Sequence, residues 1–305
     1  MKKNNIKKHI LVIGGTGFIG YHVLKKAKKL NWKLTSVSVH EPRASRYIKG
    51  VKYLKLNIKS KKEIEKKLNS NFSYIINLAG QSSEVFSTLK KKKLYDTQMS
   101  GSKNLMNFFL DKKIEKFIQI GSAAEYGSIN LPHNENNKCL PKSDYGKTKL
   151  RATKYLLKLC KKNSFPGIVI RLFQVYGATQ DQDKIIPYIL KNCVNNKSFG
   201  LSIGVQKRDF CFIDDVIQAI FILLKKNKIN GEVFNVSLGQ SISIKNLTRL
   251  IQKKTGKGKP IFGNIRLKKN EIIKSQACIK KIRKKTGWYP KINLNKGLTL
   301  MLKSI

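Results

Sequence analysis

Acidic residues and arginine are scarce in this chain of 305 residues. Its 17 Asp and Glu oppose 63 Lys and Arg, and the formal net charge is +46 at pH 7. Only 8 of these cations are arginine. Lys, Asn and Ile abound and share A/T-rich codons, so codon drift is one explanation of the charge and a functional role is the other. Hydrophobic residues still make up 41% of the sequence, which excludes a disordered polycation and predicts a globular protein.

Cysteine is also sparse, and its pattern excludes two classes of small domain. The five cysteines are odd in number and never form a CxxC pair, which fits neither a disulfide scaffold nor a zinc module. Apolar runs stay short of the ~18 to 20 residues that span a bilayer. We therefore expect a cytoplasmic protein with reduced thiols, no metal site and no membrane partner. The cysteines are Cys139, Cys160, Cys193, Cys211 and Cys278.

Short β-branched runs alternate with helical patterns through the first half of the chain. Strands are expected at 9–13, 34–39, 51–58, 74–78, 117–120 and 167–172. Helices are expected at 21–30, 61–68, 94–110 and 147–160. Such alternation predicts an α/β fold, a doubly wound parallel (Rossmann) sheet covered by helices on both faces.

The alternation loosens after about residue 175, which indicates a second, smaller lobe. We expect a dinucleotide-binding Rossmann domain at 1–175, rejoined by 210–238. Residues 176–209 and 239–305 would then form a C-terminal substrate lobe.

The sequence GGTGFIG follows the first strand and opens the first helix. Gly14 and Gly17 permit a tight turn and a close approach to a pyrophosphate, and Gly20 lets the helix pack on the strand. Phe18 and Ile19 place backbone N–H groups at the helix N-terminus, where they face the phosphates. The motif predicts a dinucleotide-binding site.

The end of the second strand, SVSVHEPRASR, lacks the usual Asp that holds the adenosine ribose of NAD. Ser38 stands in that stretch, Arg43 and Arg46 follow, and Glu41 is the nearest carboxylate. Hydroxyls and guanidinium groups suit a 2′-phosphate, so NADP is favoured and NAD remains possible. The alternative is that both arginines are ordinary surface cations.

Tyr145 and Lys149 are four residues apart, which puts both side chains on one face of a helix. An ammonium group beside a phenol favours the phenolate, so such a tyrosine can act as a general acid or base. Ser122 ends a predicted parallel strand and can hydrogen-bond the same substrate oxygen. We therefore take these three residues as the candidate catalytic set.

Seven motifs, in this order and spacing, resemble the extended short-chain dehydrogenase/reductases that act on nucleotide sugars. The resemblance runs from about residue 9 to the C-terminus. The motifs are GGTGFIG (14–20), NLAG (77–80), GSAAEYG (121–127), YGKTK (145–149), RLFQVYG (171–177), RDFCFIDDV (208–216) and TGWYP (286–290).

The resemblance implies that Tyr145 is the catalytic acid/base, assisted by Ser122, and that Lys149 holds the nicotinamide ribose and tunes Tyr145. It implies that Arg208 contacts the substrate diphosphate, and that the protein is a homodimer. For Arg208, an ion pair with a neighbouring aspartate, Asp209 or Asp214, is the alternative interpretation.

Several positions depart from the family pattern. Gln98 and Gln174 replace two usual asparagines, and Lys268 replaces an arginine, so Gln174 and Lys268 are expected to contact the substrate differently. Asn57 replaces an aspartate of the third-strand motif and is expected to reach the adenine edge. Ala79, within NLAG, is expected beside the cofactor.

The residues after Ser122 separate the family's reactions. Dehydratases carry an Asp-Glu pair where this chain has Ala123 and Ala124, so dehydration is disfavoured. Glu125 follows, and a buried structural carboxylate is one interpretation of it. We predict an NADPH-dependent 4-ketoreductase of a 4-keto-6-deoxy nucleotide sugar, similar to the CDP-abequose synthase and GDP-6-deoxymannose reductase groups. A nucleotide-sugar 4-epimerase is the alternative.

A different class of function is a non-catalytic nucleic-acid-binding relative, because the charge attracts polyanions. No basic tract alternates with aromatic residues as stacking platforms require, and the candidate catalytic set is intact. Nucleic acid is therefore disfavoured as a partner.

Overall fold

A computed structural model describes residues 7–68, 71–80, 95–129, 131–267 and 271–304. The chain forms two compact units. The first comprises Met1–Glu125, Ser143–Arg171 and Ile220–Phe234, and the second comprises Tyr126–Lys142, Leu172–Ala219 and Asn235–Ile305.

The first unit is built on a seven-stranded sheet of order β10-β6-β5-β4-β1-β2-β3. The pairings of β1 with β2 and β4, of β2 with β3 and of β4 with β5 are parallel, and the predicted doubly wound sheet is confirmed. All five residues of β1 are buried, as expected of a central strand covered on both faces. The strands are β1 (His9–Ile13), β2 (Lys33–Ser38), β3 (Lys52–Lys55), β4 (Tyr74–Asn77), β5 (Lys116–Ser122), β6 (Gly167–Leu172) and β10 (Val233–Val236).

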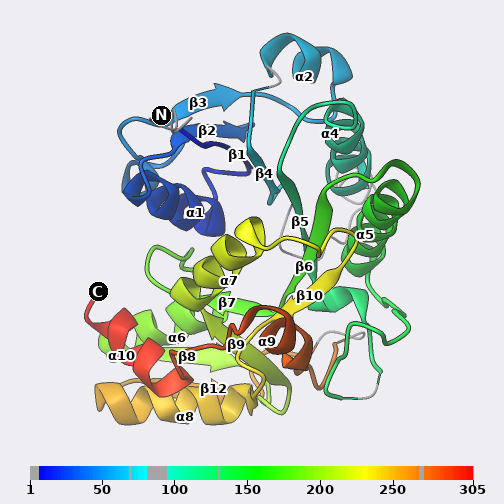
Figure 1. The fold of residues 1–305 in the computed structure, drawn as a ribbon. Helices are drawn as coiled ribbons and strands as arrows, with labels where there is room; N and C mark the ends of the chain where they lie inside the picture. The colour runs from blue at the N-terminus through cyan, green and yellow to red at the C-terminus, as the bar shows by residue number, and fades with distance from the viewer. Residues whose placement is uncertain (1–6, 69–70, 81–94, 130, 268–270, 305) are drawn as a thin grey trace. The chain divides into compact units, whose positions relative to one another are not determined.

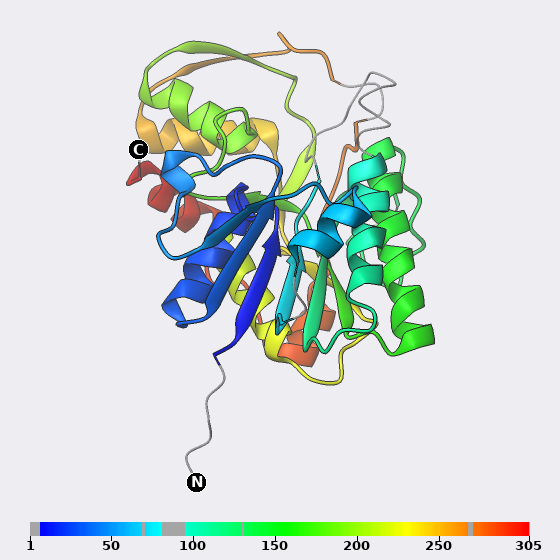
Figure 2. The ribbon, with the colours of Figure 1, turned by 90° about the horizontal axis from the view of Figure 1, so that it is seen from above.

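Helices pack on this sheet through apolar stripes. Helix α1 lies beside β1 and β2 (Figure 1). Helices α4 and α5 lie side by side (Figure 2), and α5 packs against β5. Leu11, Ile75, Phe117, Leu156 and Val169 belong to one buried cluster between strands and helices. These elements are α1 (Phe18–Lys29), η1 (Ala44–Arg46), α2 (Lys61–Lys67), η2 (Asp96–Gly101), α4 (Ser102–Phe108), η3 (Ala123–Glu125) and α5 (Asp144–Asn163).

The second unit contains a three-stranded sheet of order β11-β9-β7 and a two-stranded sheet of β12 and β8. Its strands are β7 (Gln174–Tyr176), β8 (Ser198–Leu201), β9 (Lys207–Phe212), β11 (Ser241–Ser243) and β12 (Lys259–Phe262). Its helices are α6 (Ile185–Val194), α8 (Ile244–Thr255), α9 (Lys280–Thr286) and α10 (Leu294–Leu302), and α7 (Ile213–Lys225) runs from this unit into the first.

Four segments that were expected in the dinucleotide-binding domain group with the second unit: residues 126–142 and 210–219, and the short stretches 172–175 and 235–238. The second of these contains the end of β9, which pairs with β7 and β11 and not with the large sheet. The first is joined to Asn235 by the Tyr126 hydroxyl, which donates to Oδ1 at 2.8 Å. No helix in the described part of the chain is long and apolar enough to cross a bilayer.

A fully buried carboxylate, Asp209, joins three segments of the second unit. Ser237 Oγ donates to it at 2.6 Å, and the backbone N–H groups of Leu238, Gly239 and Ala277 donate at 3.1, 3.1 and 2.9 Å. Burial raises the pKa of Asp209 to about 6, against the lowering effect of these four donors. The carboxylate therefore titrates well above its unfolded value.

This shift makes the stability of the second unit depend on pH. The folded state holds the Asp209 proton more tightly than the unfolded state, so the contribution is present below about pH 4 and is lost as pH rises through about 6. A shift of about two pKa units corresponds to about 3 kcal/mol. Denaturant unfolding between pH 4 and 7 should show this slope in the parent and a smaller slope in Asp209→Asn, in which Asp215, whose pKa burial also raises, still contributes. An identical slope in both proteins would contradict the assignment.

Candidate active site

The glycine loop lies where the strand order reverses, since β1 pairs with β2 on one side and β4 on the other. Ligands of doubly wound sheets bind at the carboxyl ends of the strands at such a point. Gly14 adopts φ +79°, and a Cβ there would lie 3.2 Å from the Leu78 carbonyl carbon and 3.4 Å from Ala79 N. A Cβ on Gly20 would lie 2.4 Å from Gly14 O, so α1 packs directly on the loop.

The first turn of α1, which includes Phe18, Ile19 and Gly20, is suited to an anion. Gly17 is the N-cap, no side chain caps it, and the turn contains no acidic residue. Its N–H groups and the positive end of the helix dipole are therefore available to phosphate. Ala79, which was expected beside the cofactor, lies next to this loop, and its contact with a cofactor stays a prediction.

A shallow hollow at the end of β2 adjoins the loop. The backbone N–H of Thr16 donates to Ser38 Oγ at 3.4 Å, and the buried Ser36 hydroxyl has no hydrogen-bond partner among the described residues. An unpaired buried hydroxyl beside a phosphate-binding loop fits a dinucleotide ribose. The lining residues are Thr16, Ser36, Ser38, His40, Glu41, Tyr53, Leu54 and Lys55.

Neither of the two arginines predicted to bind the 2′-phosphate lines this hollow. Arg43 is exposed at the N-cap of η1, and Arg46 is buried, with 6% of its surface accessible. Lys55 on β3 is a cation that does line the hollow. Asn57 is engaged locally: its Oδ1 accepts the backbone N–H of Lys59 at 3.1 Å.

Helix α5 presents Tyr145 and Lys149 in its first two turns. Ser143 starts the helix, because its Oγ accepts the Gly146 N–H at 3.1 Å. Lys149 Nζ lies 5.9 Å from the Tyr145 ring centroid and donates to the Ile120 carbonyl of β5 at 2.9 Å. Gln98 Oε1 accepts from Thr148 at 2.8 Å and ties α5 to η2.

Ser122 completes the cluster from the end of β5. Burial raises the pKa of Tyr145, and a hydrogen bond with Ser122 lowers it. Burial lowers the pKa of Lys149 to about 8, and the charge of Glu125 opposes that effect. The structure thus brings together all three residues that the sequence analysis proposed, as a phenol, a hydroxyl and a buried amine.

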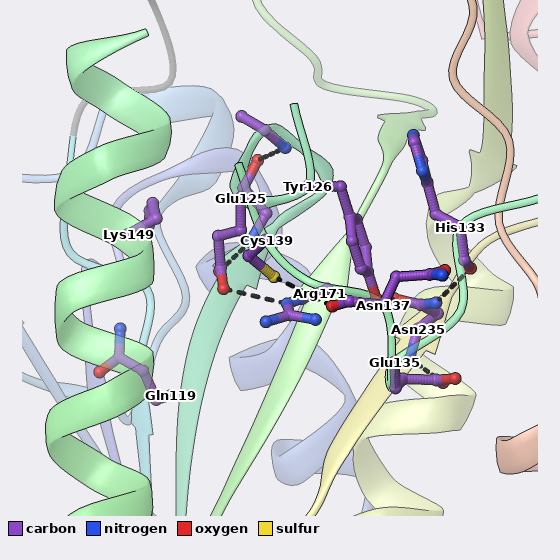
Figure 3. A network of polar contacts seen from close by, with 12 residues as sticks. Gln119, Glu125, Tyr126, His133, Glu135, Asn137, Cys139, Lys149, Arg171 and Asn235 are labelled. Atoms are coloured by element: carbon purple, nitrogen blue, oxygen red, sulfur yellow. Dashed lines mark hydrogen bonds and ion pairs between the residues drawn. The ribbon is translucent and has the colours of Figure 1, made fainter. Parts of the chain in front are cut away.

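Glu125 has a partner, Arg171, that was not predicted from the sequence (Figure 3). The carboxylate is fully buried, and its Oε2 accepts from Nε of Arg171 on β6 at 2.9 Å. Its Oε1 accepts the backbone N–H of Ser122 at 2.9 Å. An arginine inside the apolar strand GIVIRL was the available signal, since a charge there requires a partner.

The predicted substrate residues of the second unit lie on its three-stranded sheet. Gln174 on β7 is exposed and stands opposite Phe210 on β9. Arg208 on β9 forms an ion pair with Glu271 and donates to the Ile272 carbonyl at 2.6 Å. The described partner of Arg208 is therefore Glu271, and the predicted Lys268 lies outside the described residues.

Fold and site together define a dinucleotide-binding enzyme of the short-chain dehydrogenase/reductase class. The chain belongs to the NAD dependent epimerase/dehydratase family, whose model matches residues 10–237. Over 98% of both chains it is 27% identical to dTDP-4-dehydro-6-deoxyglucose reductase of Escherichia coli and 26% identical to CDP-abequose synthase of Salmonella muenchen.

Solved structures agree with the family. The crystal structure of UDP-glucose 4-epimerase from Thermotoga maritima, with UDP-glucose, matches with a TM-score of 0.90 and 25% identity. The alignment covers 97% of this chain and 98% of the epimerase. A dTDP-glucose 4,6-dehydratase from Bacillus anthracis, in complex with NAD, has the same fold, with a TM-score of 0.86 and 22% identity.

Tyr145→Phe tests the candidate catalytic set directly. The change preserves the ring and removes the transferable proton, so turnover should fall by roughly 10²- to 10⁴-fold. Steady-state kinetics with a nucleotide-sugar substrate measures this loss, and fluorescence titration should show unchanged cofactor affinity. A variant with parental turnover would reject Tyr145 as the acid or base.

Proposed function

We propose that the chain is an NADPH-dependent 4-ketoreductase of a 4-keto-6-deoxy nucleotide sugar. The observation that carries the proposal is the catalytic cluster itself, with Ser122, Tyr145 and Lys149 together and no second acid–base pair in η3, which reads Ala123, Ala124 and Glu125. Glu125 is already held by Arg171. Within the described residues, the site therefore has the groups for one proton transfer and no unengaged carboxylate that would help to eliminate water.

Each residue of the cluster has a distinct task. When bound, the nicotinamide supplies the hydride for carbon 4 of the sugar. Ser122 orients the carbonyl oxygen through its hydroxyl, and Tyr145 gives that oxygen a proton. Lys149, as a cation, favours the phenolate that remains and so lowers the cost of the transfer.

One similar protein supports a reductase, and another supports the alternative, an epimerase. One relative is named as a 4-dehydro-6-deoxy sugar reductase, whereas the matched Thermotoga maritima structure is a 4-epimerase. Glu41 in the hollow at the end of β2 favours the epimerase, because a carboxylate there suits the ribose hydroxyls of NAD. Ser36, Ser38 and Lys55 in the same hollow favour the 2′-phosphate of NADP.

The cofactor preference follows from the balance of charges around that hollow. NADPH should bind about 10-fold more tightly than NADH, since a charge-assisted contact contributes ~1.5–3 kcal/mol. Lys55→Ala should reduce this ratio, and Glu41→Gln should increase it. Dissociation constants from fluorescence titration measure both, with the exposed Lys61→Ala on α2 as control. Equal affinities in the parent protein would refute the NADPH assignment.

The reaction class is tested by its stoichiometry. A reductase should consume one NADPH for each 4-keto-6-deoxy nucleotide sugar converted, as read by absorbance and product mass. Interconversion of two 4-hydroxy epimers without net NADPH loss would establish the epimerase instead. Arg208→Ala should raise KM for the nucleotide sugar and leave NADPH affinity unchanged, because a diphosphate would lose a charge-assisted partner.

A further inference from the structure

Glu125 and Arg171 form a buried ion pair next to the candidate catalytic residue Ser122. Both side chains are almost inaccessible, at 0% and 4% exposure, in a chain with few carboxylates. Burying two charges costs more than burying apolar residues of similar volume. Apolar side chains at these two positions would therefore stabilise the fold about as well as the ion pair does. The place of the pair in the structure points to a role other than stability.

Glu125 lies in η3, three residues after Ser122, which ends β5. Glu125 Oε1 accepts the Ser122 N–H, and Ser122 Oγ accepts the Ala124 N–H at 3.2 Å, so the loop folds back on itself. A Cβ on Gly121 would lie 2.4 Å from Glu125 Oε1, which shows how closely the carboxylate lies against the strand backbone. Lys149 Nζ binds the carbonyl of the preceding residue, Ile120.

We propose that Glu125 is a positioning residue, which fixes the Ser122 loop through its backbone N–H and is the buried negative charge that acts on the Lys149 ammonium group. Arg171 holds the carboxylate in place through Nε. This inference rests on the proposed function only for its kinetic consequences. The charge effect on Lys149 is a property of the protein alone.

The electrostatics agree with this geometry. Burial lowers the pKa of Lys149 to about 8, and Glu125 raises it against that effect. At that value roughly nine-tenths of the side chain is charged at pH 7, and a further fall of about one unit would leave about half charged. The Glu125 charge also raises the pKa of Tyr145, although burial is the larger cause of that shift.

Three other charged groups on η2, α5 and β5 have partners of their own. Asp96 on η2 lies 3.7 Å from Lys59, and Asp144 in the first turn of α5 lies 4.0 Å from Lys147. Lys116, also on β5, donates to Asn230 at 2.6 Å. Glu125 is the carboxylate whose charge acts on Lys149.

The experiment measures the protonation of Lys149 without any substrate. Trace acetylation of the whole protein at pH 6 to 10, followed by peptide mass spectrometry, gives the pH midpoint at which Lys149 becomes reactive. Glu125→Gln keeps the side-chain shape and removes the charge, so the midpoint should fall by about one unit from about 8. A purely structural role predicts the opposite sign, since a loosened site hydrates Lys149 and moves its midpoint upward toward 10.5.

Two further variants separate charge from position. Glu125→Asp keeps the charge but shortens the side chain, so the midpoint should stay near 8 while kcat falls about 10²-fold from misplacement of Ser122. Asp215→Asn is the matched control: this buried carboxylate accepts the N–H groups of Lys291 and Ile292 in the second unit. Its loss should lower the melting temperature without moving the Lys149 midpoint.

The outcomes are distinguishable from those of the proposed function. An unchanged or raised midpoint in Glu125→Gln overturns the charge role, and parental kcat in Glu125→Asp overturns the positioning role. If the single variants do not fold, the double variant Glu125→Gln/Arg171→Met leaves no unpaired buried charge. A lowered Lys149 midpoint in this variant still supports the charge role, because loss of the Arg171 cation by itself would raise the midpoint. If Tyr145→Phe retains turnover, the proposed reaction fails, while the Lys149 midpoint still decides the charge role.

Discussion

The placement of β1 between β2 and β4 is the constraint on which the rest of the first unit depends. Because all three strands are parallel, their carboxyl ends meet at one edge, and the strand order reverses there. Gly14, Ser38 and Ala79 follow or end these strands, so the sheet alone brings the loop, the hollow and the NLAG turn together. Gly14 is needed because its φ of +79° is strained for any residue with a side chain, and a Cβ there would lie 3.2 Å from the Leu78 carbonyl carbon.

Much of the first unit was predictable from sequence because its elements are long and their periodicity is strong. The predicted strand 9–13 is β1, and the predicted helix 147–160 lies within α5. The helix predicted at 94–110 differs in its first described turn, which is π-helical at 96–101. A hydrophobic pattern fixes which face is buried, but does not distinguish a π turn from an α turn.

Most of the second unit was not predictable for a physical reason. Strands β7 and β11 have three residues each, too few for an alternating pattern to stand out. They form because β9 lies between them, with register set by pairs such as Gln174 with Phe210 and Ile242 with Arg208. Such pairs are 30 residues or more apart in sequence, and neither propensity nor periodicity encodes them.

The candidate site also contains residues whose proximity could be predicted from the sequence and residues whose proximity could not. Tyr145 and Lys149 share a helix turn, so their spacing sufficed to place them together. Glu125 and Arg171 are 46 residues apart and meet because β5 and β6 are neighbours in the sheet. The hollow at the end of β2 likewise contains Lys55 from β3, whereas the sequence analysis considered only the arginines that follow β2.

The large net positive charge of the chain has little effect on the electrostatics of the buried site. Three of the chain's 17 carboxylates, Glu125, Asp209 and Asp215, are at most 3% exposed, and each accepts backbone N–H groups. Surface lysines interact through water and salt, where charges separated by more than ~10 Å are largely screened. Inside the protein the effective dielectric constant is lower, so one carboxylate can outweigh many distant lysines in setting the charge of Lys149. Drift toward lysine at the surface is therefore compatible with an interior whose electrostatics depend on a few buried acids.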